Sequence, residues 1–499
     1  MSSAGEGAPR AARKFVLDNV LVALAQLLGK LRGLVTLPLL VRGLGAEGYG
    51  IWVQVISLAG IVGNLLSLNL HTPLVRMAAA DRVRAKAIVS TLTVAALGAL
   101  TLGCAVLALA SPAPLARLVA GTGDRRLFIA AMLVTWTTAA RQFPLSTYRA
   151  TERVATRSTA DFLGTLVDVA LTVALLTAGF GLVEVFWASA AWGALFVALT
   201  LAHQREHLAL AAFDGEILRE ATRYSLPLLP ATLGLWALDR ADRFVLQHFR
   251  GEAEVGVYSA HYTLASLATF MLFSLQLTLL PRCASLWAAD REGARRYLDL
   301  SCRAFTTFGL LFATVAPFAV PAALRVLAPA TATPAAPLNS ALVATGVLFY
   351  GFGIIQQMVL FITQRTRAVG LILAGSAAMN LGLNVALAPR LGGTGAALAT
   401  LITYALMAGA TFFASRDVLL VRLGLGHATR CLAAGLAAGT TFALLDPRTI
   451  AGIVLASLAS LTVYALALLA TGAVRPAEVR NAMAVVRGRS DARTSPPSR

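Results

Sequence analysis

The sequence predicts an all-α polytopic membrane protein, with about 14 transmembrane helices in two pseudo-symmetric six-helix lobes followed by two C-terminal helices. The first observation is composition: the 499 residues are 58% hydrophobic and only 13% charged, with a mean hydropathy of +0.74. Soluble domains carry roughly 25% charged residues. So few charges cannot cover a water-soluble fold of this length, and much of the surface must therefore face lipid. The length of the apolar runs and an internal repeat are the other two observations.

The apolar runs are long enough to cross a bilayer as helices. Such a helix needs roughly 20 apolar residues, and runs of about this length lie between breaks rich in charge, Pro or Gly. The least regular are 127–147 and 222–246, which charged residues and prolines interrupt. The predicted spans are 15–40, 49–70, 86–110, 127–147, 160–179, 182–203, 222–246, 256–280, 302–327, 338–363, 368–388, 394–414, 428–445 and 449–472.

The second half of the chain repeats the first. Residues 40–60, LVRGLGAEGYGIWVQVISLAG, are echoed by residues 246–266, LQHFRGEAEVGVYSAHYTLAS. Gly45 and Gly50 fall on Gly251 and Gly256, and a second apolar run follows the turn in both copies. A weaker echo joins 177–191 to 388–402. Duplicated membrane halves are typical of secondary transporters, which bind their substrate between the halves.

The repeat also predicts how the chain is divided. The connector between the halves spaces its apolar residues at helical intervals, which indicates an amphipathic helix at the membrane surface. The end of the chain is basic and rich in Pro and Ser, as disordered tails are. The predicted parts are a cytoplasmic tail at 1–14, an N-lobe at 15–203, a linker at 204–221, a C-lobe at 222–414, two additional helices at 415–472 and a basic tail at 473–499.

Membrane topology accounts for the net charge of +18. When the N-terminus is placed in the cytoplasm, thirty of the 42 Lys and Arg residues fall on the cytoplasmic side of the predicted spans. This is the positive-inside bias, and it predicts a multi-pass protein of the cell membrane with both termini in the cytoplasm. The basic residues then mark topology and contact anionic lipids, so nucleic acid is not an expected partner.

The sequence contains no recognisable catalytic or metal-binding motif. It has no P-loop, HExxH or GxSxG pattern, and its four cysteines lack paired spacing. No cofactor and no metal are expected. The enzyme-class alternative is a membrane-embedded glycosyltransferase or polysaccharide polymerase, which would need a long outer loop with catalytic residues. The outer loop near 328–338 has no charge, so the chain is not expected to be an enzyme.

Three segments carry a family resemblance: LPLLVRGLGAEGYGIW at 37–52, YSLPLLPATLGLWALDRADRFVLQHFRGEAEVGVYSAHYTLA at 224–265 and MNLGLNVALAPRLGGTGAALATLITY at 379–404. They resemble the first hairpin, the start of the second half, and the eleventh and twelfth helices of bacterial polysaccharide-precursor flippases. These flippases belong to the multidrug, oligosaccharidyl-lipid and polysaccharide exporter superfamily. The resemblance covers about residues 15–415.

The resemblance implies a transporter that flips an undecaprenyl-pyrophosphate-linked oligosaccharide by alternating access, for cell-surface polysaccharide biosynthesis. Its expected partners are the lipid-linked oligosaccharide, membrane lipids and a coupling ion, either H⁺ or Na⁺. Contacts with a glycan polymerase or with glycosyltransferases are left open. The alternative is an ion-coupled multidrug antiporter of the same superfamily, whose cavity should be net acidic to attract cationic drugs.

Charged residues in the first span are candidates for the substrate site, because each charge costs about 3 kcal/mol near the bilayer centre. Lys30 and Arg32 lie more than halfway along this span, and Gln26 shares the helix face of Lys30. The resemblance implies a cationic residue where Lys30 stands. We expect Lys30 to face a central cavity and attract the pyrophosphate, with Arg32 on nearly the opposite face. Alternatively, these side chains pair with carboxylates or extend to the membrane surface.

A second charged cluster ends the seventh span. Arg240 and Arg243 are expected to extend the anion site, and Asp239 to sense a coupling ion. The alternative is a set of salt bridges at an external helix end, since Asp239 and Arg243 are one helical turn apart. Asp168, in the middle of the fifth span, is the other candidate for ion coupling.

Three uncharged polar residues complete the candidate substrate site. His261 lies in the eighth span, and Asn380 and Asn384 lie one turn apart in the eleventh. A membrane histidine can titrate near neutral pH, and paired asparagines can line a cavity. The alternative for all three is a hydrogen bond that links packed helices.

Overall fold

The computed structural model describes residues 7–111, 117, 124–209, 212–419, 421 and 424–474. Within these ranges it describes all side chains except those of 7–32, 34, 35, 273, 274, 277 and 278. The regular secondary structure of these residues is entirely helical. Ten helices in the described ranges are long and apolar enough to cross a membrane. The predicted all-α polytopic membrane fold is therefore confirmed, whereas the count of 14 spans stays a prediction.

The helices follow the order of the predicted spans. The first half contains α1 (Gly7–Leu66), α2 (His71–Ala80), α3 (Ala85–Ala110), α5 (Arg125–Ala140), α6 (Gln142–Ala150), α7 (Val154–Thr177) and α8 (Leu182–His203). The connection contains η1 (Arg205–His207), α9 (Gly215–Ser225) and η3 (Leu226–Leu228). The second half contains α10 (Leu229–Arg250), α11 (Glu252–Ala265), α12 (Thr269–Ala289), α13 (Arg291–Leu327), η4 (Pro329–Thr331), α14 (Ala336–Ile362), α15 (Thr366–Leu391) and α16 (Gly393–Ser415), and the chain continues with α17 (Leu425–Leu445) and α18 (Ile450–Ala470).

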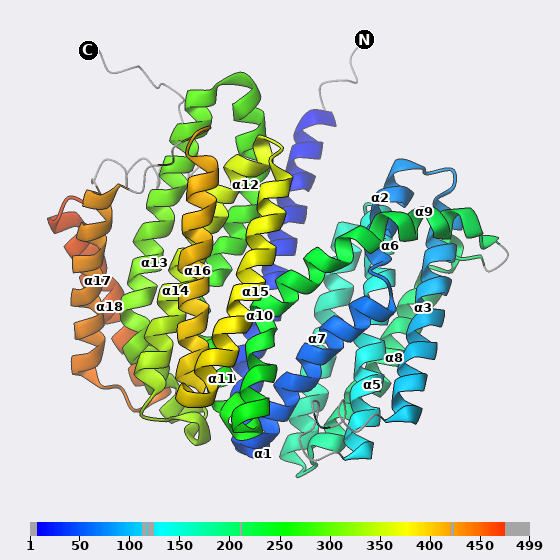
Figure 1. Ribbon diagram of the computed structural model, residues 1–499, viewed down its shortest axis with the longest axis horizontal. Helices are drawn as coiled ribbons and strands as arrows, with labels where there is room; N and C mark the ends of the chain where they lie inside the picture. The colour runs from blue at the N-terminus through cyan, green and yellow to red at the C-terminus, as the bar shows by residue number, and fades with distance from the viewer. Residues whose placement is uncertain are drawn as a thin grey trace.

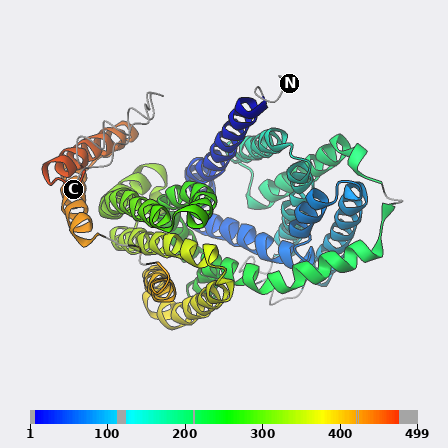
Figure 2. The same ribbon diagram turned by 90° about the horizontal axis from the view of Figure 1, so that it is seen from above.

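The helices form two groups that meet at one end of the molecule. Figure 1 shows α2, α3 and α5–α9 on one side and α11–α16 on the other, with α1 and α10 running between them. The groups converge where α1, α10 and α11 are packed together, and they diverge toward α9. Helices α17 and α18 pack on the outer side of α13, and the view from above shows the same separation into two groups (Figure 2).

The two copies of the main repeat have the same local geometry. Gly45 interrupts α1 with φ 72° and ψ −177°, and Gly251 separates α10 from α11 with φ 84° and ψ 177°. A positive φ of this kind is accessible to glycine and strained for other residues. Gly50 and Gly256 then cross so closely that a Cβ atom on either one would collide with the backbone of the other copy.

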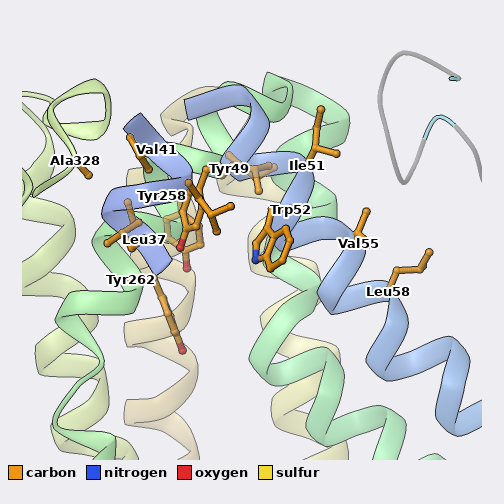
Figure 3. Close-up of a cluster of buried hydrophobic side chains, with 14 of the residues drawn as sticks. Leu37, Val41, Tyr49, Ile51, Trp52, Val55, Leu58, Tyr258, Tyr262 and Ala328 are labelled. Atoms are coloured by element: carbon orange, nitrogen blue, oxygen red, sulfur yellow. The ribbon is translucent and has the colours of Figure 1, made fainter. Parts of the chain in front are cut away.

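Buried aromatic and aliphatic side chains surround this crossing at the convergent end (Figure 3). Leu40, Val55 and Tyr258 are completely inaccessible to solvent. The ring of Trp52 on α1 stacks on Phe186 of α8, with centroids 5.0 Å apart. Such aromatic pairs contribute roughly 0.5–1.5 kcal/mol beyond the burial of their area. Together, the buried side chains and the backbone contact of Gly50 with Gly256 close this end of the cavity.

The connector forms the amphipathic helix α9, which packs on α2 and α3. Its N-cap Asp214 accepts backbone hydrogen bonds from Glu216 and Ile217. Asp214 also forms an ion pair with Arg84, 3.1 Å away. These contacts attach the connector to the first group of helices.

Candidate functional site

A cavity of about 700 Å³ lies between the two groups of helices. Residues of α1, α5, α7 and α8 line it on one side, and residues of α10, α11, α12, α14 and α16 line it on the other. Ligand sites in proteins usually measure roughly 300–1,000 Å³. The cavity therefore has the size of a ligand site and the position, between duplicated halves, where transporters bind their substrate.

Helix α10 supplies most of the charge on one wall, through Asp239, Arg240 and Arg243. Asp239 and Arg240 lie four and three positions before Arg243, so each is within one helical turn of it on the same side of α10. Arg240 Nε donates to Asp239 Oδ2 at 2.7 Å, and the two side chains are 38% and 56% exposed. An ion pair this exposed contributes only about 0–1 kcal/mol. Arg240 can therefore exchange Asp239 for a more strongly charged anion.

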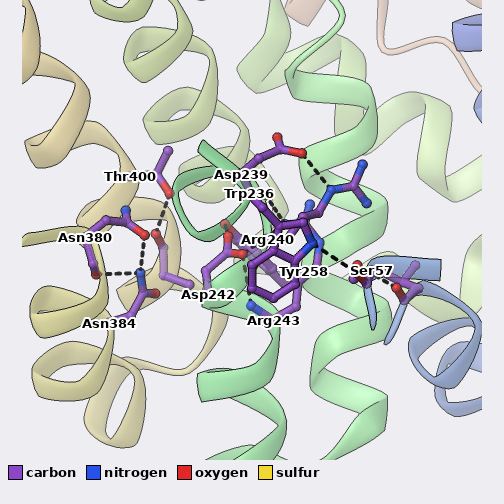
Figure 4. A network of polar contacts seen from close by, with 12 residues as sticks. Ser57, Trp236, Asp239, Arg240, Asp242, Arg243, Tyr258, Asn380, Asn384 and Thr400 are labelled. Carbon is purple, nitrogen blue, oxygen red and sulfur yellow. Dashed lines mark hydrogen bonds and ion pairs between the residues drawn. The ribbon is translucent and has the colours of Figure 1, made fainter. Parts of the chain in front are cut away.

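Arg243 is held in place by a buried network (Figure 4). Its Nη1 atom donates to Asp242 Oδ1 at 2.9 Å and to the carbonyl oxygen of Asp239 at 2.7 Å. The Tyr258 hydroxyl donates to the other carboxylate oxygen of Asp242 at 2.6 Å. Arg243 Nε has no hydrogen-bond partner among the described residues. The network thus compensates the buried charges and leaves one guanidinium donor unused.

The opposite wall is formed by α5, α7 and α8. It contains Asp168, Arg141, Trp192 and Phe196. The guanidinium of Arg141 lies over the Phe196 ring, 4.9 Å from its centroid. Counting both walls, the described lining contains three guanidinium groups and two carboxylates. Arg141 pairs with Asp161 at 3.1 Å and Arg243 with Asp242 at 2.9 Å, and neither of these carboxylates belongs to the described lining.

The structure brings together four of the residues predicted for the site: Asp168, Asp239, Arg240 and Arg243. His261 is fully buried between α11, η4 and α14. Its Nε2 atom lies 2.9 Å from the carbonyl oxygen of Thr331, and its Nδ1 lies 3.2 Å from Asn339 Nδ2. Because the amide nitrogen can only donate, Nδ1 accepts and Nε2 carries the proton. In this structure His261 links helices and is not among the described lining residues.

Asn380 and Asn384 are also buried away from the described lining of the cavity. Asn380 Nδ2 donates to Thr403 Oγ1 at 3.3 Å, which links α15 to α16. Asn384 Nδ2 donates to the carbonyl oxygen of Asn380 at 2.9 Å (Figure 4). The remaining predicted residues, Gln26, Lys30 and Arg32, lie outside the described side chains.

The aromatic lining was not predicted from the sequence. Tyr49, Trp52, Trp192, Tyr262 and Tyr404 all line the cavity, but within apolar spans they look like packing or lipid-facing residues. Arg141 is not among the residues predicted for the site, and its position inside the predicted span 127–147 is the signal that could have placed it at the cavity. The described residues contain no group of three or more His, Cys, Asp or Glu side chains able to hold a metal ion.

Solved structures with the same fold are membrane transporters. The chain is similar to the lipid II flippase MurJ in an inward closed conformation, with a TM-score of 0.67, 13% identity, and 91% of this chain and 98% of that chain covered. It is also similar to an inward-facing MATE family multidrug resistance transporter of the MOP superfamily (TM-score 0.61, 16% identity, 79% and 97% covered). A third similar structure is a MOP superfamily transporter from Pyrococcus furiosus described as having a binding pocket of reverse polarity. Its TM-score is 0.55 and its identity 15%, with 80% of this chain and 93% of that chain covered.

The comparison with curated proteins gave no significant match. The model of the family described as "Polysaccharide biosynthesis protein" matches residues 16–287, which is more than half of the chain. This match begins in α1 and ends in α12, so it includes the repeated hairpins and the charged residues of α10. The chain is therefore a multi-pass membrane protein of the polysaccharide biosynthesis family, with the fold of MOP superfamily transporters.

Proposed function

We propose that this protein is a flippase that moves an undecaprenyl-pyrophosphate-linked oligosaccharide across the cytoplasmic membrane for cell-surface polysaccharide biosynthesis. The observation that carries the proposal is the presence of three guanidinium groups, those of Arg141, Arg240 and Arg243, in the described lining of the cavity. Pyrophosphate is an anion with several acceptor oxygens, and arginine binds phosphate through paired, charge-assisted hydrogen bonds. The family match to polysaccharide biosynthesis supports the same cargo.

Each wall has a part in this proposal. Arg240 leaves its exposed pair with Asp239 and binds the pyrophosphate, while Arg243 stays anchored to Asp242 and places its positive charge at the cavity wall. Lys30, Arg32 and Gln26 of α1 would extend the anion site. His261, Asn380 and Asn384 would contribute only in a conformation that opens the helix contacts in which they are buried. The lipid tail remains in the bilayer.

Alternating access would proceed by rocking of the two groups of helices about the cavity. They converge where α1, α10 and α11 are packed together and diverge toward α9 (Figure 1). If the connector and both termini are cytoplasmic, as the charge distribution predicts, this conformation faces inward. The cargo would enter from the cytoplasmic leaflet, and the sealed end would have to open for release.

An ion-coupled multidrug antiporter is the second candidate. Two carboxylates, Asp168 and Asp239, line the cavity, and MATE family transporters share the fold. Both carboxylates could instead bind the coupling ion of a flippase. A glycosyltransferase or polymerase is less well supported, because the matched structures are transporters.

A flipping assay in proteoliposomes tests the proposal. The lipid-linked oligosaccharide is extracted from the producing strain, and its appearance on the far leaflet is followed with a membrane-impermeant glycan oxidant. The protein should accelerate flipping. Arg240→Gln should slow it about tenfold, because one charge-assisted hydrogen bond is worth roughly 1.5–3 kcal/mol.

Arg448→Gln is the matched control, because Arg448 is 84% exposed, lies between α17 and α18, and is absent from the described lining. It should flip the lipid at the wild-type rate. If wild-type protein leaves the lipid on its original leaflet but exports a cationic dye along an ion gradient, the antiporter is the correct function.

A further inference from the structure

The wall formed by α5, α7 and α8 differs in chemistry from the wall formed by α10. Trp192 and Phe196 lie one turn apart on α8 and both line the cavity, with ring centroids 6.4 Å apart and ring planes tilted by 58°. Ser189, one turn earlier on the same face, also lines it, and the Ser189 Oγ atom has no hydrogen-bond partner among the described residues. Phe196 is 6% exposed and Arg141 covers its ring, so Trp192 provides the aromatic face toward the cavity, with the buried Ser189 hydroxyl one turn away.

Packing holds these aromatic residues in fixed positions. Trp192 Nε1 donates to the carbonyl oxygen of Gly164 at 2.8 Å. Two glycines let α8 approach its neighbours: a Cβ on Gly164 would lie 2.6 Å from the Phe196 ring, and one on Gly193 would lie 2.6 Å from Thr137 Cβ. Because the rings are already ordered, a ligand can stack on them without the loss of side-chain conformational entropy that ordering a mobile ring would require.

We propose that this surface, formed by Ser189, Trp192 and Phe196 with Arg141 beside them, is a carbohydrate subsite that binds a pyranose ring of the cargo. A pyranose presents C–H groups on its faces and hydroxyl groups around its edge. The face of an aromatic ring carries negative charge density that attracts polarised C–H groups. The guanidinium of Arg141 has five N–H donors, of which the pair with Asp161 at 3.1 Å uses one, so others can meet the hydroxyl groups. Ser189 Oγ can join them once the ligand displaces the atoms that cover it.

The subsite assigns the two ends of the cargo to different groups of helices. The pyrophosphate binds to the arginines of α10, and the first sugar stacks on α8. Trp192 would then decide whether the transporter distinguishes a glycosylated lipid from its sugar-free carrier. The subsite rests on the proposed function, since it requires a lipid-linked sugar as cargo.

The test measures the affinity of the full-length protein in nanodiscs for two probes: the lipid-linked oligosaccharide of the producing strain, and undecaprenyl pyrophosphate without sugar. Wild-type protein should bind the glycosylated lipid about tenfold more tightly. Trp192→Ala should remove this preference and leave the affinity for the sugar-free lipid unchanged, whereas Trp192→Phe should retain most of the preference. Arg240→Gln should weaken both probes by a similar factor.

Trp187→Ala is the control for loss of an α8 tryptophan, because Trp187 is exposed and absent from the described lining. It should bind both probes as wild type does. The subsite is wrong if wild-type protein binds the two lipids equally, or if Trp192→Ala weakens both to the same extent. If wild-type protein binds neither lipid, the proposed flippase function itself fails, and the two failures are thereby distinguished.

Discussion

The arginines of α10 differ in how firmly they are held. Arg243 is 4% exposed and bonded to Asp242, which is itself fixed by the Tyr258 hydroxyl. Breaking a buried ion pair of this kind by removing one partner typically costs about 3–5 kcal/mol, so Arg243 is part of the framework as well as of the site. Arg240 and Asp239 are exposed enough to separate. The residue that engages an anion first is therefore Arg240.

Asp168 is buried in α7 and lines the cavity, which makes it the carboxylate to test for ion coupling. Asp168→Asn keeps the size of the side chain but removes its charge. Transport driven by a proton or sodium gradient should fall to the rate measured without a gradient, in proteoliposomes with imposed gradients.

Glu184→Gln serves as the control, because Glu184 is exposed in the first turn of α8 and absent from the described lining. It should keep the full response to the gradient. An unchanged pH and sodium dependence in Asp168→Asn excludes Asp168 from the coupling step.

Apart from Arg141, the charged residues of the described lining could be found in the sequence, but the aromatic ones could not. A charge in an apolar run stands out because insertion is unfavourable, and this reasoning found Asp168 and the α10 cluster. Trp187 and Trp192 look the same in the sequence of α8, yet one is exposed on the outer surface and the other lines the cavity. Only tertiary packing distinguishes them.

Helices α1 and α11 approach each other closely enough for their backbones to be in contact. The crossing depends on two glycines, Gly50 and Gly256, whose missing side chains leave room for the opposing backbone. Small residues allow membrane helices to pack in this way without a water-driven hydrophobic effect.

Gly256→Ala should therefore destabilise the protein, because the added Cβ meets the carbonyl oxygen of Ala46 and the helices must separate. Overpacking of this kind costs about 1–3 kcal/mol, and the thermal unfolding midpoint in nanodiscs should fall accordingly.

Gly98→Ala is the matched control within helix α3, where an added Cβ has no neighbour within 4 Å. It should leave the midpoint unchanged or raise it slightly, since alanine favours helix by roughly 1 kcal/mol. Equal effects of the two substitutions would contradict a role for the crossing.

The lengths of the helices could be predicted from hydropathy, but their breaks could not. The span 127–147 is divided into α5 and α6 around Arg141, and 256–280 into α11 and α12 after Ala265. Gly45, by contrast, has a non-helical backbone that divides α1 into two helices, at the place where the sequence predicts a turn between the spans 15–40 and 49–70. The hydropathy of a segment indicates whether it is buried in the membrane or in the protein. Where a helix breaks depends on the packing of its next turn against neighbouring helices, which hydropathy does not contain.

The whole molecule has an orientation in the membrane that the charge distribution predicts and that labelling can test. Two exposed positions can each carry a single reporter cysteine. Val83 lies in the connection between α2 and α3, and Arg448 lies in the connection between α17 and α18. The four native cysteines are buried. In intact cells a membrane-impermeant maleimide should label Arg448→Cys, and it should label Val83→Cys only after permeabilisation. The reverse pattern would invert the topology and make the described conformation outward-facing.

The crossing of the two glycines is also an isologous contact. Ala46 faces Gly256 while Glu252, its counterpart 206 positions later, faces Gly50, so the same patch serves both sides, as in a two-fold symmetric dimer. A larger side chain at either glycine would collide with the backbone of the other copy, which limits how far the two sequences can differ at this contact. The cavity walls are under no such mutual restraint. The two walls could therefore acquire different side chains, such as Trp192 and Phe196 on α8 and Arg240 and Arg243 on α10, while the crossing that joins the halves kept its symmetry.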